Sequence, residues 1–375
     1  MIRKSNSVTA RSQPRRLSSS TRSQKSERRT SFGSMDYRAT TLEPHHIIVE
    51  DQQMDDERWS RLAFALGMPY SDTRRSSPEA TRFAQQVRSR RTISSKEMTS
   101  LLLPLLVAVA KDHKMMKCRT DALFHRDGIP DDVPDYEVEE GWKMQLPTPK
   151  PTITLGYSSG AFNSHQLELQ HGIISNNRGE PCDLHKLSQP VPDVYWPFFI
   201  IEALDDSMLA ARNACAGSAA TCNNALMVFA GAAQEPMKAY HDMNFLWNLS
   251  KAAQSFSLAI NGKTACLNTH NSEGCLPHAV GVIRTYRLDD EQEVEAMAAR
   301  IGSIFVWAEN CRLQWISDLL GHFDRRVQLC KDTMAKNGVS YDPTELANFG
   351  VVPKTRRSII KSVIAESLPR WAWPL

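Results

Sequence analysis

The sequence predicts a mixed α/β fold, an α+β or α/β domain with a central mixed β-sheet flanked by helices, from three observations. Residues 194–203 form an apolar and aromatic run typical of a central strand covered on both faces. Residues 256–260 and 264–268 flank Asn261-Gly262, which predicts a hairpin with a type I′ turn. Apolar residues recur at helical spacing through residues 291–324. Strands and helices in this order do not form a βαβ repeat.

The remaining elements follow from caps and periodicity. Residues 55–66 are amphipathic at helical spacing, and Ser77-Pro78 begins a second helix with a serine cap and a proline at the first position. A further helix begins near Ser94-Ser95 and contains a mostly buried apolar run. Residues 153–157 alternate as a strand, and residues 208–229 form a helix whose small side chains allow close packing on the sheet.

Composition divides the chain into three parts. Residues 1–55 are rich in serine and arginine and poor in large apolar residues, so we expect a disordered basic arm. Its basic clusters suit nuclear localisation or nucleic-acid contact, or form an ordinary solvated tail. Residues 56–330 form the folded domain. Residues 331–375 form a tail in which 354–368 predict a short basic amphipathic helix. Docking on a partner or covering the sheet is the default role for this helix, and weak membrane contact also fits it.

The cysteines and the apolar runs limit the compartment. Eight cysteines include no C-x-x-C pair, and no apolar signal segment precedes them, which favours free thiols in a reducing compartment. The longest apolar run, residues 101–110, contains Pro104 and is about half the length that a membrane span needs. We therefore expect an intracellular protein, nuclear or cytoplasmic and not secreted, without a membrane span and with an oligomeric state left open.

The strand that ends in Glu202 carries the chemistry of interest. Metal-dependent cleavage of phosphodiesters needs carboxylates for Mg²⁺ and a cation near the scissile phosphate. One compact solution places an aspartate at a strand end and Glu-x-Lys on the neighbouring strand, because residues i and i+2 share a face. Glu202 and Leu204 stand in that relation in this sequence.

Three segments carry a family resemblance: P-K-P-T-I-T-L-G-Y from Pro149, W-P-F-F-I-I-E-A-L from Trp196, and A-R-N-A-C-A-G-S-A within the following helix. They resemble an uncharacterised group of fungal proteins, which is itself similar to the PD-(D/E)XK restriction-endonuclease-like superfamily. The resemblance implies a nuclease-like core with an aspartate in the first segment and Glu-x-Lys in the second. This chain has Thr152 and Leu204 at those positions and keeps only Glu202.

Two of the three catalytic positions are thus of the wrong type. A threonine hydroxyl brings no charge to a magnesium site, and leucine offers nothing to a phosphate. The leading expectation is a catalytically degenerate nuclease-like domain, not an enzyme and without a cofactor, that binds nucleic acid through its basic arm or binds a protein. A structural scaffold without nucleic-acid contact is one alternative.

The other alternative is an active, Mg²⁺-dependent nuclease with a relocated site around the retained glutamate. Asp205 and Asp206 follow that glutamate directly and would serve as further metal ligands. Pro192-Asp193 offers a literal P-D pair, but it precedes the glutamate by a stretch of about 30 Å if the strand is extended. The missing cation would come from Arg212 or Lys251.

No other segment competes with this site. His165, His171 and His185 fall in a polar connection without metal-ligand spacing. Cys215 and Cys222 are two helical turns apart, which favours core packing over a redox pair.

Overall fold

The computed structural model describes most of the chain between residues 31 and 342. The described residues are 31–69, 77–131, 144–176, 180–205, 207–233, 249, 251–272 and 278–342. Three sequence predictions therefore lie outside the described residues: the arm over residues 1–30, the metal-ligand role of Asp206, and the amphipathic helix over residues 354–368.

A seven-stranded mixed sheet forms the centre of the fold, as the sequence predicts. Its strand order is β1 (Ile47–Gln53), β9 (His278–Arg287), β8 (Thr264–Ser272), β7 (Ser255–Asn261), β6 (Tyr195–Ala203), β3 (Ile153–Tyr157) and β2 (Met116–Thr120). The pairs β1–β9 and β6–β7 are parallel, and the other neighbours are antiparallel. A separate two-stranded sheet joins β4 (Ile173–Ser175) and β5 (Pro181–Asp183).

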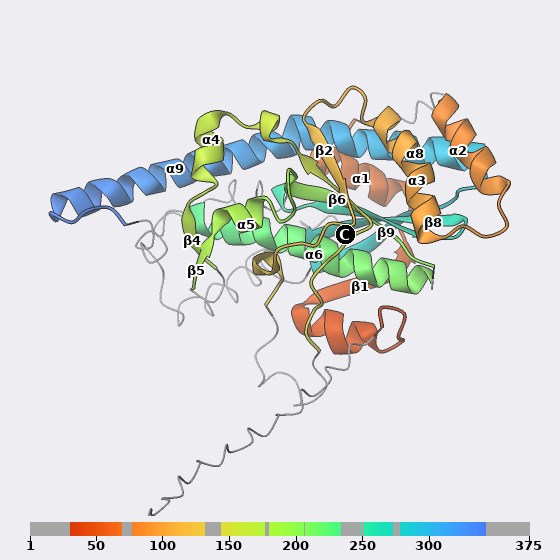
Figure 1. The fold of residues 1–375 in the computed structure, drawn as a ribbon, viewed down its shortest axis with the longest axis horizontal. Helices are drawn as coiled ribbons and strands as arrows, with labels where there is room; N and C mark the ends of the chain where they lie inside the picture. Colours follow the sequence, from red (N-terminus) through yellow and green to blue (C-terminus); the bar gives the residue numbers. More distant parts are fainter. Residues whose placement is uncertain are drawn as a thin grey trace, which may run out of the picture.

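Helices cover both faces of the large sheet (Figure 1). The helix α6 (Met208–Ala233) lies on one face and connects the parallel strands β6 and β7. On the opposite side lie α1 (Asp56–Leu66), α2 (Pro78–Arg88), α3 (Ser95–Val109), α8 (Glu291–Trp307) and α9 (Leu313–Lys336). Two short helices, α4 (Ser164–Leu169) and α5 (Leu184–Ser188), flank the small sheet. The core therefore has sheet in the middle and helix on either side.

The helix boundaries follow from their caps. Ser94 begins α3 with a reciprocal capping box to Glu97, and α2 begins with Pro78 after Ser77. Pro104 lies inside α3 and does not end it. The predicted helix over residues 291–324 is two helices, α8 and α9, joined by a π-helical turn over Ala308–Arg312.

The π-helical turn places Arg312 in the interior. Its guanidinium group donates to the carbonyl oxygens of Trp196 at 2.9 Å, Pro197 at 3.4 Å and Ala252 at 3.0 Å. It also lies over the ring of Tyr157, with 5.7 Å from the guanidinium carbon to the ring centroid. These contacts join the helix layer to the start of β6, where Trp196 has a positive φ of 44°.

The predicted boundary of the arm at residue 55 is wrong. Residues 47–53 are β1, which pairs with β9 at one edge of the sheet. Tyr37, Leu42 and Ile47 are buried against Leu146 and neighbouring side chains of α6. These apolar residues are widely spaced among polar ones, so composition averaged over the arm conceals them.

Two further expectations about local structure need correction. The hairpin loop is Gly262-Lys263 between paired Asn261 and Thr264, and only Gly262 has a positive φ, of 56°. That pattern favours a type II′ turn over the predicted type I′ turn. The tail predicted from residue 331 also begins too early, because α9 continues to Lys336.

Candidate functional site

Glu202 and Thr152 lie side by side on neighbouring strands, at the end of β6 and just before the start of β3. The antiparallel register pairs Ile201 with Ile153, which places Thr152 opposite Glu202. The backbone N–H and the hydroxyl of Thr152 donate to Oε2 of Glu202 at 3.4 Å and 3.5 Å. The same hydroxyl accepts the N–H of Ala203 at 3.1 Å. From α6, the hydroxyl of Ser218 lies 3.3 Å from Oε1. The two motif segments therefore meet.

Burial controls the charge of this carboxyl group. Glu202 is 5% exposed, and its removal from water raises its pKa from the usual 4.5 to about 8. The hydrogen bonds from Thr152 and Ser218 lower the pKa, but by less than burial raises it, and the negative charge of Asp121 raises it further. At pH 7 this shift favours the neutral form of Glu202. A neutral carboxyl group is a poor ligand for Mg²⁺, which prefers ionised oxygens.

Leu204 shares a face with Glu202 but lies in an apolar environment. It packs, together with Met208, against a cluster formed by Ala211, Cys215, Ala259, Cys266 and Val282. The side chains of α6 and of strands β7 to β9 thus fill the space where the family pattern would place a lysine. The position contributes packing and no charge.

Asp205, predicted as a possible metal ligand, serves the start of α3 instead. Its carboxylate accepts the backbone N–H of Ser95 at 2.6 Å, in the first turn of that helix. The hydroxyl of Ser95 donates to the carbonyl oxygen of Ala203. Glu202 points toward α6, on the other face of β6, so the two carboxyl groups do not converge.

The other proposed substitutes also have different partners. Asp193 is ion-paired with Arg119 at the beginning of β6. Arg212 is ion-paired with Asp51 and donates to Asn268 at 3.4 Å. Lys251 precedes β7 and lies 5.8 Å from the ring centroid of Trp315, whereas Glu202 is level with the far end of β7.

The described part of the chain contains no group of three or more histidine, cysteine, aspartate or glutamate side chains able to hold a metal ion. Of the predicted histidines, His165 lies 3.1 Å from Asp324, while His171 and His185 stack with ring centroids 4.6 Å apart. Cys215 and Cys222 are buried, free thiols in the core, as predicted.

A buried polar network between α6 and the sheet was missed in the sequence. The Nε2 atom of His270 lies 2.7 Å from the hydroxyl of Ser257, and the Asn268 amide donates to the same hydroxyl at 3.3 Å. Burial lowers the pKa of His270 to about 3, so this imidazole is neutral. The polar residues alternate with apolar ones along β7 and β8. The same alternation is typical of a strand with one face in solvent, so the sequence did not predict that these polar residues are buried.

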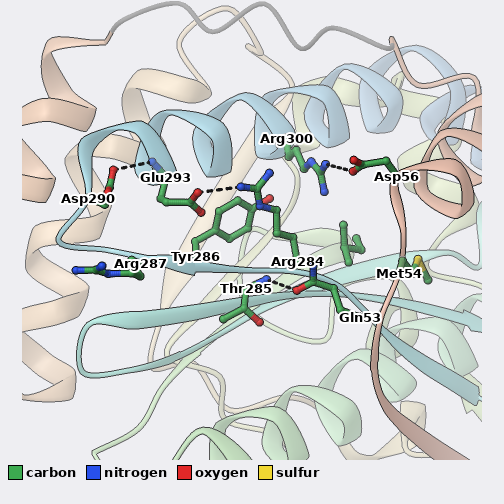
Figure 2. A pocket seen from close by; sticks show the side chains of 11 residues that line it. Gln53, Met54, Asp56, Arg284, Thr285, Tyr286, Arg287, Asp290, Glu293 and Arg300 are labelled. Atoms are coloured by element: carbon green, nitrogen blue, oxygen red, sulfur yellow. Dashed lines mark hydrogen bonds and ion pairs between the residues drawn. The ribbon is translucent and has the colours of Figure 1, made fainter.

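A second candidate site is an open groove of about 590 Å³ beside the end of β1. Figure 2 shows its floor, formed by residues 284–287 of β9, and its wall, formed by the start of α8. The arginines of the groove have carboxylate partners: Arg284 with Glu293 at 2.9 Å, Arg287 with Asp289 at 3.2 Å, and Arg300 with Asp56 at 3.8 Å. The groove is polar, but its positive groups are already compensated.

The helices of the described segments lack the length and apolarity needed to cross a bilayer. A comparison with curated proteins found no match. A family model, the domain of unknown function DUF7924, matches residues 82–320. The match covers more than half of the 375 residues and extends from α2 into α9, including both motif segments. The chain therefore belongs to the DUF7924 family.

Proposed function

We propose that this protein is a restriction-endonuclease-like domain that no longer cleaves nucleic acid and acts as a binding module. The proposal includes the relationship to the PD-(D/E)XK superfamily and to its fungal relatives. The adjacency of the two motif segments supports that relationship, since Thr152 and Glu202 occupy neighbouring strand ends as the pattern requires. The surrounding order of α3, the antiparallel strands β2, β3 and β6, then α6 and the parallel strand β7, gives the mixed core that the resemblance implies.

One observation supports the loss of catalysis: the carboxyl group of Glu202 is enclosed, with only 5% of the residue exposed. Its two oxygens contact hydroxyl and amide donors of Thr152 and Ser218, and Leu204 beside it is packed among apolar side chains. A metal nuclease needs ionised carboxylates open to a hydrated cation and to a phosphate. This arrangement instead satisfies a buried acid with hydrogen bonds.

The test compares cleavage with binding for the full-length chain. We expect no cleavage of supercoiled plasmid DNA, single-stranded DNA or single-stranded RNA with Mg²⁺ or Mn²⁺. The matched control is Glu202→Gln, which keeps the size of the side chain and removes its ability to ionise. Cleavage by the natural sequence that disappears in Glu202→Gln would establish the relocated nuclease in place of the binding module.

Binding to nucleic acid is measured separately, as the change in fluorescence anisotropy of a labelled duplex across a salt series. If the basic arm contacts phosphates, affinity falls as salt rises and falls further when residues 1–30 are deleted. Binding with no salt dependence of this kind would exclude the arm as a phosphate-binding element.

A further inference from the structure

The strand β2 forms an open edge of the central sheet. Among the residues that the structure describes, it is the last strand in the order and pairs with β3 alone. The N–H of Ser158 donates to the carbonyl of Met115 at 2.8 Å, and the N–H of Asp121 donates to the carbonyl of Thr152 at 3.1 Å. In an antiparallel pair, alternate residues direct both backbone groups to the partner. Residues 115, 117, 119 and 121 therefore face β3, and the backbone groups of Cys118 and Thr120 face outward.

These outward backbone groups have no hydrogen-bond partner among the residues that the structure describes. One face of this strand is open to solvent, and the side chains of Lys117 and Arg119 are exposed there. On its other face, Met116 and Cys118 are partly buried against the main core. The edge thus presents Lys117, together with Arg119 and its Asp193 partner, on one side and apolar surface on the other.

The charge of this edge distinguishes it from the other open surfaces. The opposite edge strand, β1, carries Glu50 and Asp51, both ion-paired with arginines. In the groove of Figure 2 the arginines are likewise paired with carboxylates. Lys117 has no ion-pair partner in the described segments, while Arg119 has Asp193.

We infer that the open edge of β2 binds an extended, acidic segment of a partner protein by β-strand addition. The main chain of that segment would pair with Cys118 and Thr120, and one of its carboxylates would lie across from Lys117. Opposite charges on paired strands add affinity and select for an acidic partner, and the backbone bonds add affinity without sequence preference. The inference rests on the proposed binding role and names its partner chemistry.

A lysine on an edge strand has a second physical explanation, because it also discourages pairing between sheets of different molecules. The two explanations make opposite predictions for an acidic peptide. A protective lysine leaves the edge closed to all strands, whereas a recognition lysine admits a strand of complementary charge.

The experiment titrates the full-length chain into a fluorescein-labelled peptide, Glu-Val-Glu-Thr-Glu-Val-Glu, and follows anisotropy. We expect saturable binding, with affinity lower by about tenfold or more for the matched peptide in which lysine replaces each glutamate. N-methylation of alternate residues removes the N–H donors along one edge of the peptide. If that edge is the one that pairs with β2, the affinity should also fall by about tenfold or more. Hydrogen exchange should slow at the outward amides of Cys118 and Thr120 when the acidic peptide binds.

Two variants locate the site on the protein. Lys117→Glu should weaken the acidic peptide by about tenfold, while Lys96→Glu, at an exposed position in the first turn of α3, should leave binding unchanged. Cys118→Pro removes an outward N–H and leaves the β3 ladder in place, so it should weaken binding of the peptide. The substitution also replaces a partly buried side chain, so thermal melting is used to verify the fold of the variant.

Three results would overturn the inference: no saturable binding of the acidic peptide, equal binding by Lys117→Glu, or exchange protection that spares β2. If another part of the chain already occupies the edge of β2, the acidic peptide will not bind, which is the first of these results. The cleavage and duplex-binding assays use different probes, so a failure here is distinguishable from a failure of the proposed function.

Discussion

Replacing Glu202 with glutamine should remove a large pH dependence of folding stability. In the folded chain the pKa of Glu202 is about 8, against a usual value of 4.5. Between these values the folded state holds a proton that the unfolded state has released. The contribution of the protonated Glu202 carboxyl group to the free energy of unfolding is therefore fully present below pH 4.5. This contribution is lost as the pH rises toward 8.

The magnitude follows from the size of the shift. Each pKa unit corresponds to about 1.4 kcal/mol, so the interval represents a loss of about 5 kcal/mol between mildly acidic and mildly alkaline solution. Glu202 is almost completely enclosed, so solvent screening does not reduce this figure substantially. In the variant, the side-chain oxygen of glutamine still accepts the hydrogen bonds of Thr152. The amide nitrogen replaces the carboxyl oxygen that lies 3.3 Å from the Ser218 hydroxyl, and it can donate to that hydroxyl. We expect the variant to match the natural sequence within about 1 kcal/mol at pH 5 and to exceed it above pH 8.

Urea unfolding, followed by tryptophan fluorescence from pH 5 to pH 9, measures the difference. The buried rings of Trp196 and Trp307 lie in the main core and report on global unfolding. Glu57→Gln is the matched control: it makes the same chemical change on the surface of α1, where the side chain is 81% exposed. Its stability should follow the natural sequence at every pH, because other titrating groups are common to all three proteins.

A constant difference between Glu202→Gln and the natural sequence over this range would refute the reasoning. It would mean that Glu202 is ionised in the fold, and hence that a charged carboxylate is available to a cation. In that case addition of Mn²⁺ at pH 7 should raise the melting temperature of the natural sequence but not that of the variant, and the active-nuclease alternative would regain support.

Three other substitutions test the packing that positions the site. Gly156→Ala would place a Cβ atom 2.6 Å from the carbonyl oxygen of Tyr195, so we expect a loss of about 1–3 kcal/mol in urea unfolding. Gly231→Ala, in α6 with no described atom within 4 Å of the added carbon, should instead gain up to about 1 kcal/mol; a similar loss in both would point to a general effect of the substitution. Arg312→Met leaves three buried carbonyls without their donor and should cost about 3 kcal/mol or more, and an unchanged unfolding midpoint would show that water replaces the guanidinium group.

Long apolar patterns made the centre of the sheet predictable. The run in β6, the alternation in β3 and the two halves of the β7–β8 hairpin each identify a strand from side-chain type alone. The edge strands were not predictable in the same way. In β1 and β2 the apolar residues are few and lie among charged ones, because an edge strand buries little surface and gains its order from pairing with a neighbour.

For the candidate site, the sequence could predict which residues meet but not their state. The resemblance placed Thr152 and Glu202 on neighbouring strands, and their hydrogen bond agrees with that placement. Burial, partners and charge depend on α6, whose Ser218 completes the contacts of the carboxyl group. Asp205 had the residue type of a metal ligand, yet its direction is set by the first turn of α3. Residue type is local information, whereas the pKa of a buried acid depends on everything packed around it.

The hydrogen bonds of Thr152 give the acid at position 202 a structural role that does not depend on catalysis. One hydroxyl accepts from the backbone of Ala203 and donates to Glu202, which in turn contacts Ser218 on α6. Three elements, β3, β6 and α6, are thereby joined at the point where two central strands approach their ends. Replacing Glu202 with an apolar residue would leave the N–H of Thr152 and the hydroxyl of Ser218 buried without this partner, at a cost of about 1–3 kcal/mol each. A neutral glutamic acid fixed in this way stabilises the sheet against α6, and that role requires neither a lysine at position 204 nor an aspartate at position 152.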